Sequence, residues 1–220
     1  MINIAIDGPA GAGKSSLSRL LAKELGYIYV DTGALYRAVG LKFSRLGFDT
    51  ELVGDMDSVL ADTSLDIRFI GGEQRVYLDG QDVSDDIRTP VASMMASAVS
   101  AKPVVRAFLL DMQRKLAANN NAVMDGRDIG TVVLPNADVK IFLTADVEIR
   151  AARRLKELEE KGQKVSFEDV LEDMKVRDYN DSHREIAPLK QADDAVLADT
   201  GALTFEESFE LLLSIVKERT

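Results

Sequence analysis

The chain has 220 residues with one His and no Cys, and its formal net charge at pH 7 is −10. This length suggests one domain, with or without insertions, and the hydrophobic share of 46% excludes wholesale disorder. The lack of Cys excludes disulfides and thiolate metal sites. No apolar run approaches the roughly 18 residues of a membrane span. The acidic charge argues against general binding of nucleic acid or membrane surfaces, but a small anionic ligand needs only a local cationic pocket.

Strand and helix patterns alternate along most of the chain. The expected order is a strand at 2–7, a helix at 14–25 closed by Gly26, a strand at 27–30 and a helix at 34–45. After an irregular middle region come strands at 122–125 and 139–143, helices at 146–160 and 167–184, a strand at 195–198 and a helix at 205–218. Such alternation predicts an α/β fold with a parallel sheet and right-handed crossovers.

Residues 60–100 break this alternation. Short strand-like runs at 67–70 and 76–78 are separated by Gly71-Gly72, a pattern typical of antiparallel hairpins. Thr89-Pro90 then has the form of an N-cap followed by Pro at the first helical position. We expect a small inserted subdomain here.

The strongest motif is a phosphate-binding loop between the first expected strand and helix. It matches G-x-x-x-x-G-K-[ST], in the context that this motif requires. Its small residues let backbone N–H groups turn around a phosphate, and the helix N-terminus adds its dipole. Lys14 reaches the β/γ-phosphates and the Ser15 hydroxyl is a Mg²⁺ ligand. The expected ATP-binding residues are Gly8, Pro9, Ala10, Gly11, Ala12, Gly13, Lys14, Ser15 and Ser16.

A chance glycine-rich turn is the alternative to a nucleotide site, and the agreement of motif and context argues against it. The loop does not identify the phosphate acceptor. A GTPase switch would carry N-K-x-D after a strand, and the chain has none. The D-x-x-G spacing within residues 125–130 is a weak match by itself, so a nucleotide-dependent switch protein is disfavoured but stays open.

The expected helix at 167–184 carries an apolar stripe that turns into charges. Phe167, Val170 and Met174 belong to the stripe, and its next members are Arg177, Asp178, Asp181 and Arg184. Because a buried charge is costly unless it is paired or liganded, this pattern favours a ligand site. The alternatives are a helix end that becomes solvated and an i,i+4 pair between Arg177 and Asp181.

Other arginines are further candidates, since Arg binds phosphate bidentately and stays charged. Arg150, Arg153 and Arg154 lie on one expected helix, either in a phosphate-facing lid or on a solvated face with Glu157, Glu159 and Glu160. Arg127, Asp128 and Arg37 follow expected strands, where open α/β sheets bind ligands. We expect His183 to be a surface residue, and Asp85-Asp86 and Asp193-Asp194 to lie on exposed turns.

With these residues in place, the chain resembles the bacterial cytidylate kinases, a family of nucleoside monophosphate kinases. The matching blocks run from the first strand to near the C-terminus. They are residues 6–15, 31–37, 125–133, 139–143 and 177–188. The 125–133 block and the insertion distinguish this family from adenylate and shikimate kinases. The resemblance implies one P-loop NTPase domain over 1–220 with a five-stranded parallel core. It also implies an acceptor-subdomain insertion at about 60–100 and a short lid at about 150–165.

The resemblance also implies the activity and the site. It implies transfer of the γ-phosphoryl group of ATP to CMP or dCMP, with Mg²⁺. The lack of Cys and of an export signal favours a cytoplasmic protein, and we expect a monomer, with a weak dimer left open. Thr32 stands where the family is expected to have Ser, but it retains the hydroxyl. The implied acceptor-binding residues are Thr32, Arg37, Arg106, Arg127, Asp128, Arg177, Asp181 and Arg184, of which Thr32, Arg106 and Asp128 would read cytosine. The implied catalytic residues are Lys14, Arg127, Arg153, Arg154 and Arg177.

Alternatives remain at this point. Phosphoryl transfer depends on positioning and charge neutralisation, and these would equally serve UMP or a non-nucleotide acceptor. Asp128 has a second interpretation, in which it only orients Arg127 as an ion-pair partner.

Overall fold

The computed structural model describes residues 1–160 and 162–220, so Lys161, inside the expected lid range, lies outside the described residues. Strand pairing gives a five-stranded sheet in the order β2-β6-β1-β7-β8 and a three-stranded sheet in the order β3-β4-β5. By its internal contacts the chain divides into two compact units. One comprises Met1 and residues 27–122, and the other comprises residues 2–26 and 123–220.

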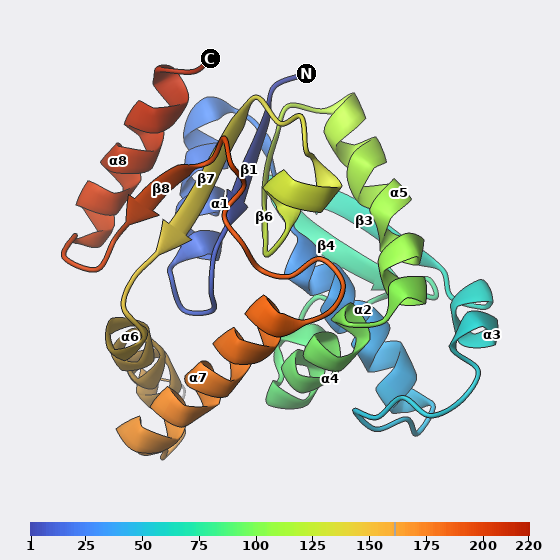
Figure 1. Cartoon of the computed structure of the whole chain (residues 1–220). Coiled ribbons are helices and arrows are strands. Elements are labelled where there is room, and N and C mark those ends of the chain that lie inside the picture. Colours follow the sequence, from blue (N-terminus) through green and yellow to red (C-terminus); the bar gives the residue numbers. More distant parts are fainter. Residues whose placement is uncertain (161) are drawn as a thin grey trace. The chain divides into compact units, whose positions relative to one another are not determined.

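The second unit contains most of the parallel sheet (Figure 1). Its elements are β1 (Asn3–Asp7), α1 (Lys14–Leu25), β6 (Ala122–Gly126), a π-helical turn (Ile129–Val133), β7 (Val139–Thr144), α6 (Val147–Glu160), α7 (Phe167–His183), β8 (Val196–Asp199) and α8 (Phe205–Lys217). Strand β7 pairs in parallel with β1, Asp7 opposite Phe142, and with β8, Thr144 opposite Asp199. Residues 4–6 of β1 are fully buried, as expected for a parallel strand covered on both faces.

Local signals place the helix ends of this unit. Gly26 takes a left-handed conformation and closes α1, as its sequence position predicts. The Ser166 hydroxyl accepts the Asp169 N–H at the start of α7. At the start of α8, Thr204 and Glu207 form a reciprocal capping box. Figure 1 shows α6 and α7 side by side, and they share a small apolar cluster that includes Ala151, Val170 and Met174.

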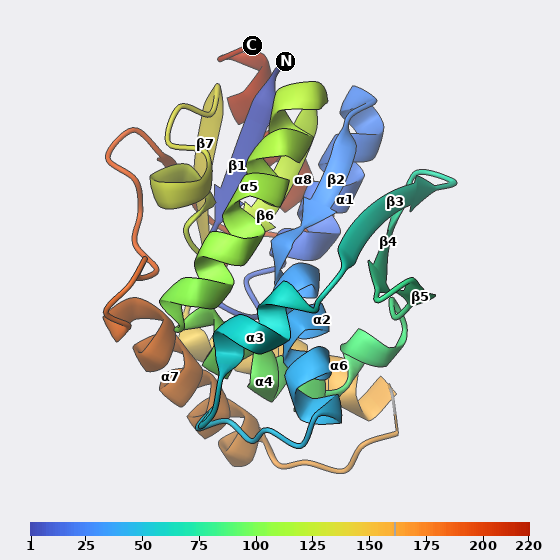
Figure 2. The same ribbon diagram turned by 90° about the vertical axis from the view of Figure 1, so that its right-hand side faces the viewer.

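The first unit holds the insertion and its supporting helices (Figure 2). Its elements are β2 (Ile28–Asp31), α2 (Thr32–Arg45), α3 (Met56–Ala61), β3 (Leu65–Ile70), β4 (Glu73–Leu78), β5 (Gln81–Asp82), a 3-10 turn (Asp86–Arg88), α4 (Pro90–Ser100) and α5 (Pro103–Asn119). The antiparallel hairpin is confirmed, with six residue pairs between β3 and β4. Thr89 caps α4 and Pro90 occupies its first turn, as expected.

Some boundaries differ from the sequence-based expectation. Helix α2 begins at Thr32, two residues early, because the Asp31 side chain accepts the Ala34 N–H and caps the helix there. Helix α5 and the short helix α3 were not expected. In α5 the apolar stripe is interrupted by Arg106 and Gln113, two polar residues that are nevertheless buried.

Among the described residues, no single helix combines the length and apolar character needed to cross a membrane. Helices α4 and α5 meet that criterion of length and composition only as a pair, across a bend of 100°.

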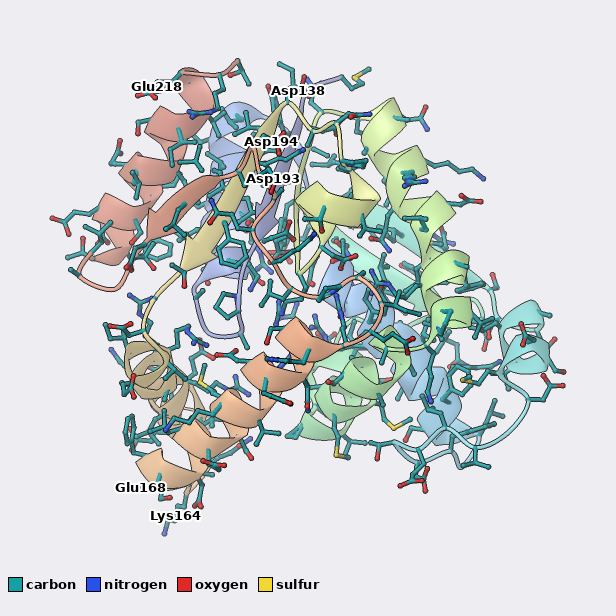
Figure 3. All side chains as sticks on the ribbon, in the orientation of Figure 1. Asp138, Lys164, Glu168, Asp193, Asp194 and Glu218 are labelled. Carbon is teal, nitrogen blue, oxygen red and sulfur yellow. The ribbon has the colours of Figure 1, made fainter. Side chains whose placement is uncertain are left out.

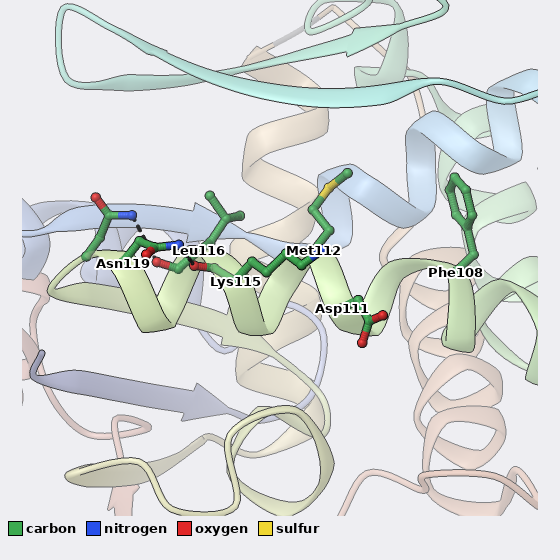
Figure 4. A pocket seen from close by; sticks show the side chains of 7 residues that line it. Phe108, Asp111, Met112, Lys115, Leu116 and Asn119 are labelled. Carbon is green, nitrogen blue, oxygen red and sulfur yellow. Dashed lines mark hydrogen bonds between the residues drawn. The ribbon is translucent and has the colours of Figure 1, made fainter.

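A groove of about 410 Å³ runs along α5 (Figure 4). Its lining residues are Phe108, Asp111, Met112, Lys115, Leu116, Asn119 and Asn120. None of the expected site residues lines it.

Candidate active site

The phosphate loop joins the end of β1 to the start of α1. Gly8 has φ +151°, and a Cβ there would lie 2.0 Å from the Leu143 carbonyl oxygen, so only Gly fits. Gly13 has φ +88° and forms the N-cap of α1, a conformation that Gly adopts at no steric cost. The buried Lys14 ammonium donates to the Pro9 carbonyl at 2.7 Å, across the loop. The loop therefore curls around a buried cation at a helix N-terminus, the arrangement that binds phosphates.

Several charged groups act on Lys14. The pKa of Lys14 is lowered to about 7, chiefly by burial and also by Arg127 and Arg177, while Asp125 and Asp181 oppose this shift. Residues far apart in the sequence thus form one mixed-charge cluster around the ammonium. A phosphate placed there would favour the charged form of Lys14.

Asp125, at the end of β6, contacts the residue after Lys14. The Ser15 hydroxyl donates to its Oδ2 atom at 2.9 Å, and Asp125 is buried. A hydroxyl and a carboxylate are oxygen donors of the kind that Mg²⁺ takes together with nucleotide phosphates. These two side chains fit a magnesium ion. No group of three or more His, Cys, Asp or Glu side chains that could hold a metal by themselves occurs among the described residues.

The charged end of the α7 stripe faces inward. Asp181 accepts the Arg127 Nε–H at 2.7 Å, and Arg184 donates to Asp128 Oδ1 at 3.2 Å. Both side chains of the second pair are under 10% exposed. Burial by itself raises the pKa of Asp181, but Arg127, Arg177 and Arg184 outweigh it, so this pKa lies below its usual value. The helix end is therefore not simply solvated, and Asp181 pairs with Arg127.

Arg150 of α6 supports the phosphate loop. Its guanidinium donates to the Ala145 and Ala10 carbonyls at 2.8 and 3.0 Å and to Asp178 at 2.6 Å. Arg150 is buried, and a Cβ on Gly11 would lie 3.2 Å from the Cβ of Arg150. Arg150 thus joins the loop to α7, a role that the sequence pattern did not assign.

Asp7 fixes the segment that follows Arg127 and Asp128. Its carboxylate accepts the Ile129 and Gly130 N–H groups at 2.8 and 2.7 Å. Burial raises the pKa of Asp7 to about 6, although these two hydrogen bonds lower it. The residue just before the phosphate loop therefore also anchors the π-helical turn.

The other arginines of α6 have different surroundings. Arg153 donates to the Thr200 carbonyl at 2.7 Å. Arg154, whose side chain is 42% exposed, pairs with Glu157 at 2.9 Å, three residues away, which is the contact expected of a solvated helix face.

The first unit holds the remaining expected site residues. Thr32 is buried at the first position of α2, and Arg37 donates to Asp31 at 2.7 Å. Arg106 of α5 is buried, donates to the Ser100 carbonyl at 3.2 Å and lies over the Tyr36 ring, 5.7 Å from its centroid.

The residues set aside in the sequence lie on the surface. His183 is exposed and stacks on Tyr179. Asp193 and Asp194 are exposed on the loop before β8, near Asp138 and at the amino-terminal end of the strands (Figure 3). Asp194 accepts Lys140 Nζ at 2.7 Å, a structural contact.

Asp7 and Asp125 were not expected as site residues, and the candidates Arg150 and Asp178 were not expected to brace the phosphate loop. Asp7 and Asp125 end buried strands, a position that identifies candidates for the carboxyl edge of the sheet. Arg150 and Asp178 needed the packing of α6 on α7, which no local pattern provides.

A strand, a glycine-rich loop around a buried lysine, and buried arginine–aspartate pairs in the same unit define a P-loop phosphotransferase. The cytidylate kinase family model matches residues 4–218. The chain is 51% identical over 214 residues to the cytidylate kinase of Caldicellulosiruptor saccharolyticus, covering 97% of this chain and 95% of the relative. It is 46% identical over 222 residues to that of Lactobacillus johnsonii, covering 100% and 95%. The chain belongs to the cytidylate kinase family.

Among solved structures, an uncharacterized protein from Eubacterium ventriosum aligns over 100% of both chains, with a TM-score of 0.55 and 14% identity. This likeness concerns the fold alone.

Proposed function

We propose that the protein transfers the γ-phosphoryl group of ATP to CMP or dCMP, giving ADP and CDP or dCDP. The observation that carries this proposal is the buried Lys14 ammonium inside a phosphate loop, clustered with Arg127, Arg177, Asp125 and Asp181. The family of the chain supplies the class of acceptor.

On the donor side, the loop residues 8–16 bind the ATP phosphates through backbone N–H groups and the α1 dipole. Lys14 leaves the Pro9 carbonyl for the β/γ-phosphates. Ser15 and Asp125 would hold Mg²⁺, which supplies positive charge to the phosphate oxygens when bound. Arg150 keeps the loop in shape through the Ala10 carbonyl.

On the acceptor side, Arg127 and Arg184, with Arg37, bind the acceptor phosphate and sugar side. Arg177 reaches the phosphates, and Asp181 binds the sugar hydroxyls. Their support is the network in which Asp181 and Asp128 already hold Arg127 and Arg184 in fixed geometry. Preorganised charges of this kind stabilise a transition state without reorganisation. Thr32, Arg37 and Arg106 complete the acceptor site, with Thr32, Arg106 and Asp128 reading the base.

The reaction needs no dedicated protein base, because the attacking atom is a phosphate oxygen whose second pKa is about 6. Lys14, Arg127 and Arg177, together with the lid residues Arg153 and Arg154, neutralise charge on the transferring group. Closure of a lid at about 150–165 would exclude water and suppress ATP hydrolysis. We further propose a monomer that works in the cytoplasm, where both substrates are available.

A panel of acceptors tests the proposed function. With ATP and Mg²⁺, ADP formation is measured with CMP, dCMP, UMP, AMP, shikimate or no acceptor. We expect kcat/KM to be highest for CMP and dCMP and ATP consumption to be slow without an acceptor. A higher kcat/KM for another acceptor, or ATP turnover that does not depend on any acceptor, would overturn the proposal.

A further inference from the structure

Gln74 of the inserted hairpin binds the backbone of Asp31, the last residue of β2. The Asp31 N–H donates to Gln74 Oε1 at 2.8 Å, and Gln74 Nε2 donates to the Asp31 carbonyl at 3.2 Å. One side-chain amide thus pairs with both backbone groups of one residue, as a neighbouring strand would in an antiparallel ladder. Among side chains, only those of Gln and Asn offer a donor and an acceptor in this arrangement.

Asp31 is in turn the residue that organises the following segment. Its Oδ1 atom accepts the Ala34 N–H at 2.9 Å and so caps α2. Its Oδ2 atom accepts Arg37 at 2.7 Å. The backbone held by Gln74 therefore sets the start of α2, where Thr32 lies buried, and the direction of the Arg37 guanidinium.

The hairpin itself does not depend on Gln74. Strands β3 and β4 pair over six residues, the Val76 N–H donates to Ser84, and Arg75 pairs with Asp82. The hydrogen bonds of Gln74 instead reach a residue 43 positions away in the sequence. Their loss would leave the hairpin folded and release the Asp31 backbone.

We propose that Gln74 is a positioning residue for the phosphate acceptor. Gln74 holds Asp31 and, through Asp31, it fixes Arg37 and the N-terminus of α2. This inference rests on the proposed function, because the proposed function assigns Thr32 and Arg37 to the binding of CMP. On this proposal the inserted sheet takes part in acceptor recognition through the side-chain amide of Gln74. Acceptor affinity should therefore depend on Gln74, and ATP affinity should not.

The test compares three variants with the wild type. Gln74→Met keeps the length and apolar stem but removes both hydrogen bonds. Gln74→Glu keeps the acceptor for the Asp31 N–H and loses the donor to its carbonyl. Glu73→Gln is the matched control, because Glu73 is an exposed neighbour on the same strand.

For Gln74→Met we expect KM for CMP to rise about fivefold to tenfold, the effect of losing two neutral hydrogen bonds that fix a binding group. KM for ATP should change less than about twofold, and the melting temperature should stay close to that of the control. Gln74→Glu should fall between Gln74→Met and the wild type. Equal changes in both KM values, or none, would overturn the proposal.

Hydrogen exchange gives a second readout that does not use activity. Amides of residues 31–37 should exchange faster in Gln74→Met, whereas those of 147–160 should not. Unchanged exchange at 31–37 would overturn the positioning role. A wild-type enzyme that does not phosphorylate CMP would instead refute the proposed function, so the two failures are distinguishable.

Discussion

The buried Lys14 ammonium lies inside the phosphate loop at the start of α1, where the proposal places the ATP phosphates. Lys14→Ala should lower kcat by at least about 10², comparable to losing one preorganised electrostatic donor. Because burial already lowers the pKa of Lys14 to about 7, its removal should not reduce the melting temperature. Steady-state kinetics at saturating ATP and CMP check this, with Lys23→Ala, an exposed lysine of the same helix, as the control. A kcat near that of the wild type would refute a role in the transition state.

Asp7 gives the chain a pH-dependent stability. Its pKa is about 6 in the folded protein, against 3.8 for the free group, so the folded state binds this proton more tightly than the unfolded state. The resulting stabilisation is fully present below about pH 4 and is lost as the pH rises through about 6, a change of roughly 3 kcal/mol.

Urea unfolding of the wild type and Asp7→Asn between pH 4 and 7 measures this effect. Carboxylates with lowered pKa values make both proteins more stable as the pH rises. The difference in free energy of unfolding between the two proteins therefore isolates the effect of Asp7. We expect the free energy of unfolding of the wild type, relative to that of Asp7→Asn, to decrease as the pH rises. A difference that is independent of pH would contradict the raised pKa.

Asp128 is expected to discriminate between bases. A carboxylate only accepts hydrogen bonds, so it suits the amino group of cytosine and repels the O4 atom of uracil. Asp128→Ala should reduce kcat/KM for CMP more than for UMP, with a loss of discrimination of about 1–3 kcal/mol. The pairing of Asp128 with Arg184, and of Arg127 with Asp181, weakens the interpretation that Asp128 only orients Arg127. If kcat/KM for CMP and kcat/KM for UMP fell by the same factor, Asp128 would have a structural role only.

At the scale of elements, α7 shows what a sequence pattern can predict. The apolar positions Val170 and Met174 pack on α6, and the same stripe continues into the buried Asp181. Spacing alone therefore predicted that charged side chains turn inward. It did not predict their partners, because Arg127 and Arg150 approach from other elements.

The insertion and α6 are the elements expected to respond to substrates. Hydrogen exchange in residues 60–100 and 147–160 should slow when CMP and a non-hydrolysable ATP analogue are both present, because binding shifts the population toward closed states. Either ligand alone should protect less. Unchanged exchange in both segments with both ligands would count against two moving parts.

At the scale of the molecule, alternating apolar runs and helical stripes predicted the parallel sheet and its helices in the correct order. The phosphate loop could be located from the sequence, because its glycines, lysine and serine lie within one run of eight residues, 8–15. Helix α5 escaped prediction since buried Arg106 and Gln113 disrupt its apolar stripe. The long-range links made by Asp7, Arg150 and Gln74 join residues 28 to 140 positions apart in sequence, and only the folded chain brings such pairs together.

The central claim is that the γ-phosphoryl group passes from ATP to the phosphate of CMP. Incubation with Mg²⁺, CMP and ATP labelled in the γ-phosphate tests it most directly, by following where the label goes. The account predicts label in the β-phosphate of CDP, formed in step with ADP. Label that appears mainly as inorganic phosphate, or CDP without label, would contradict it.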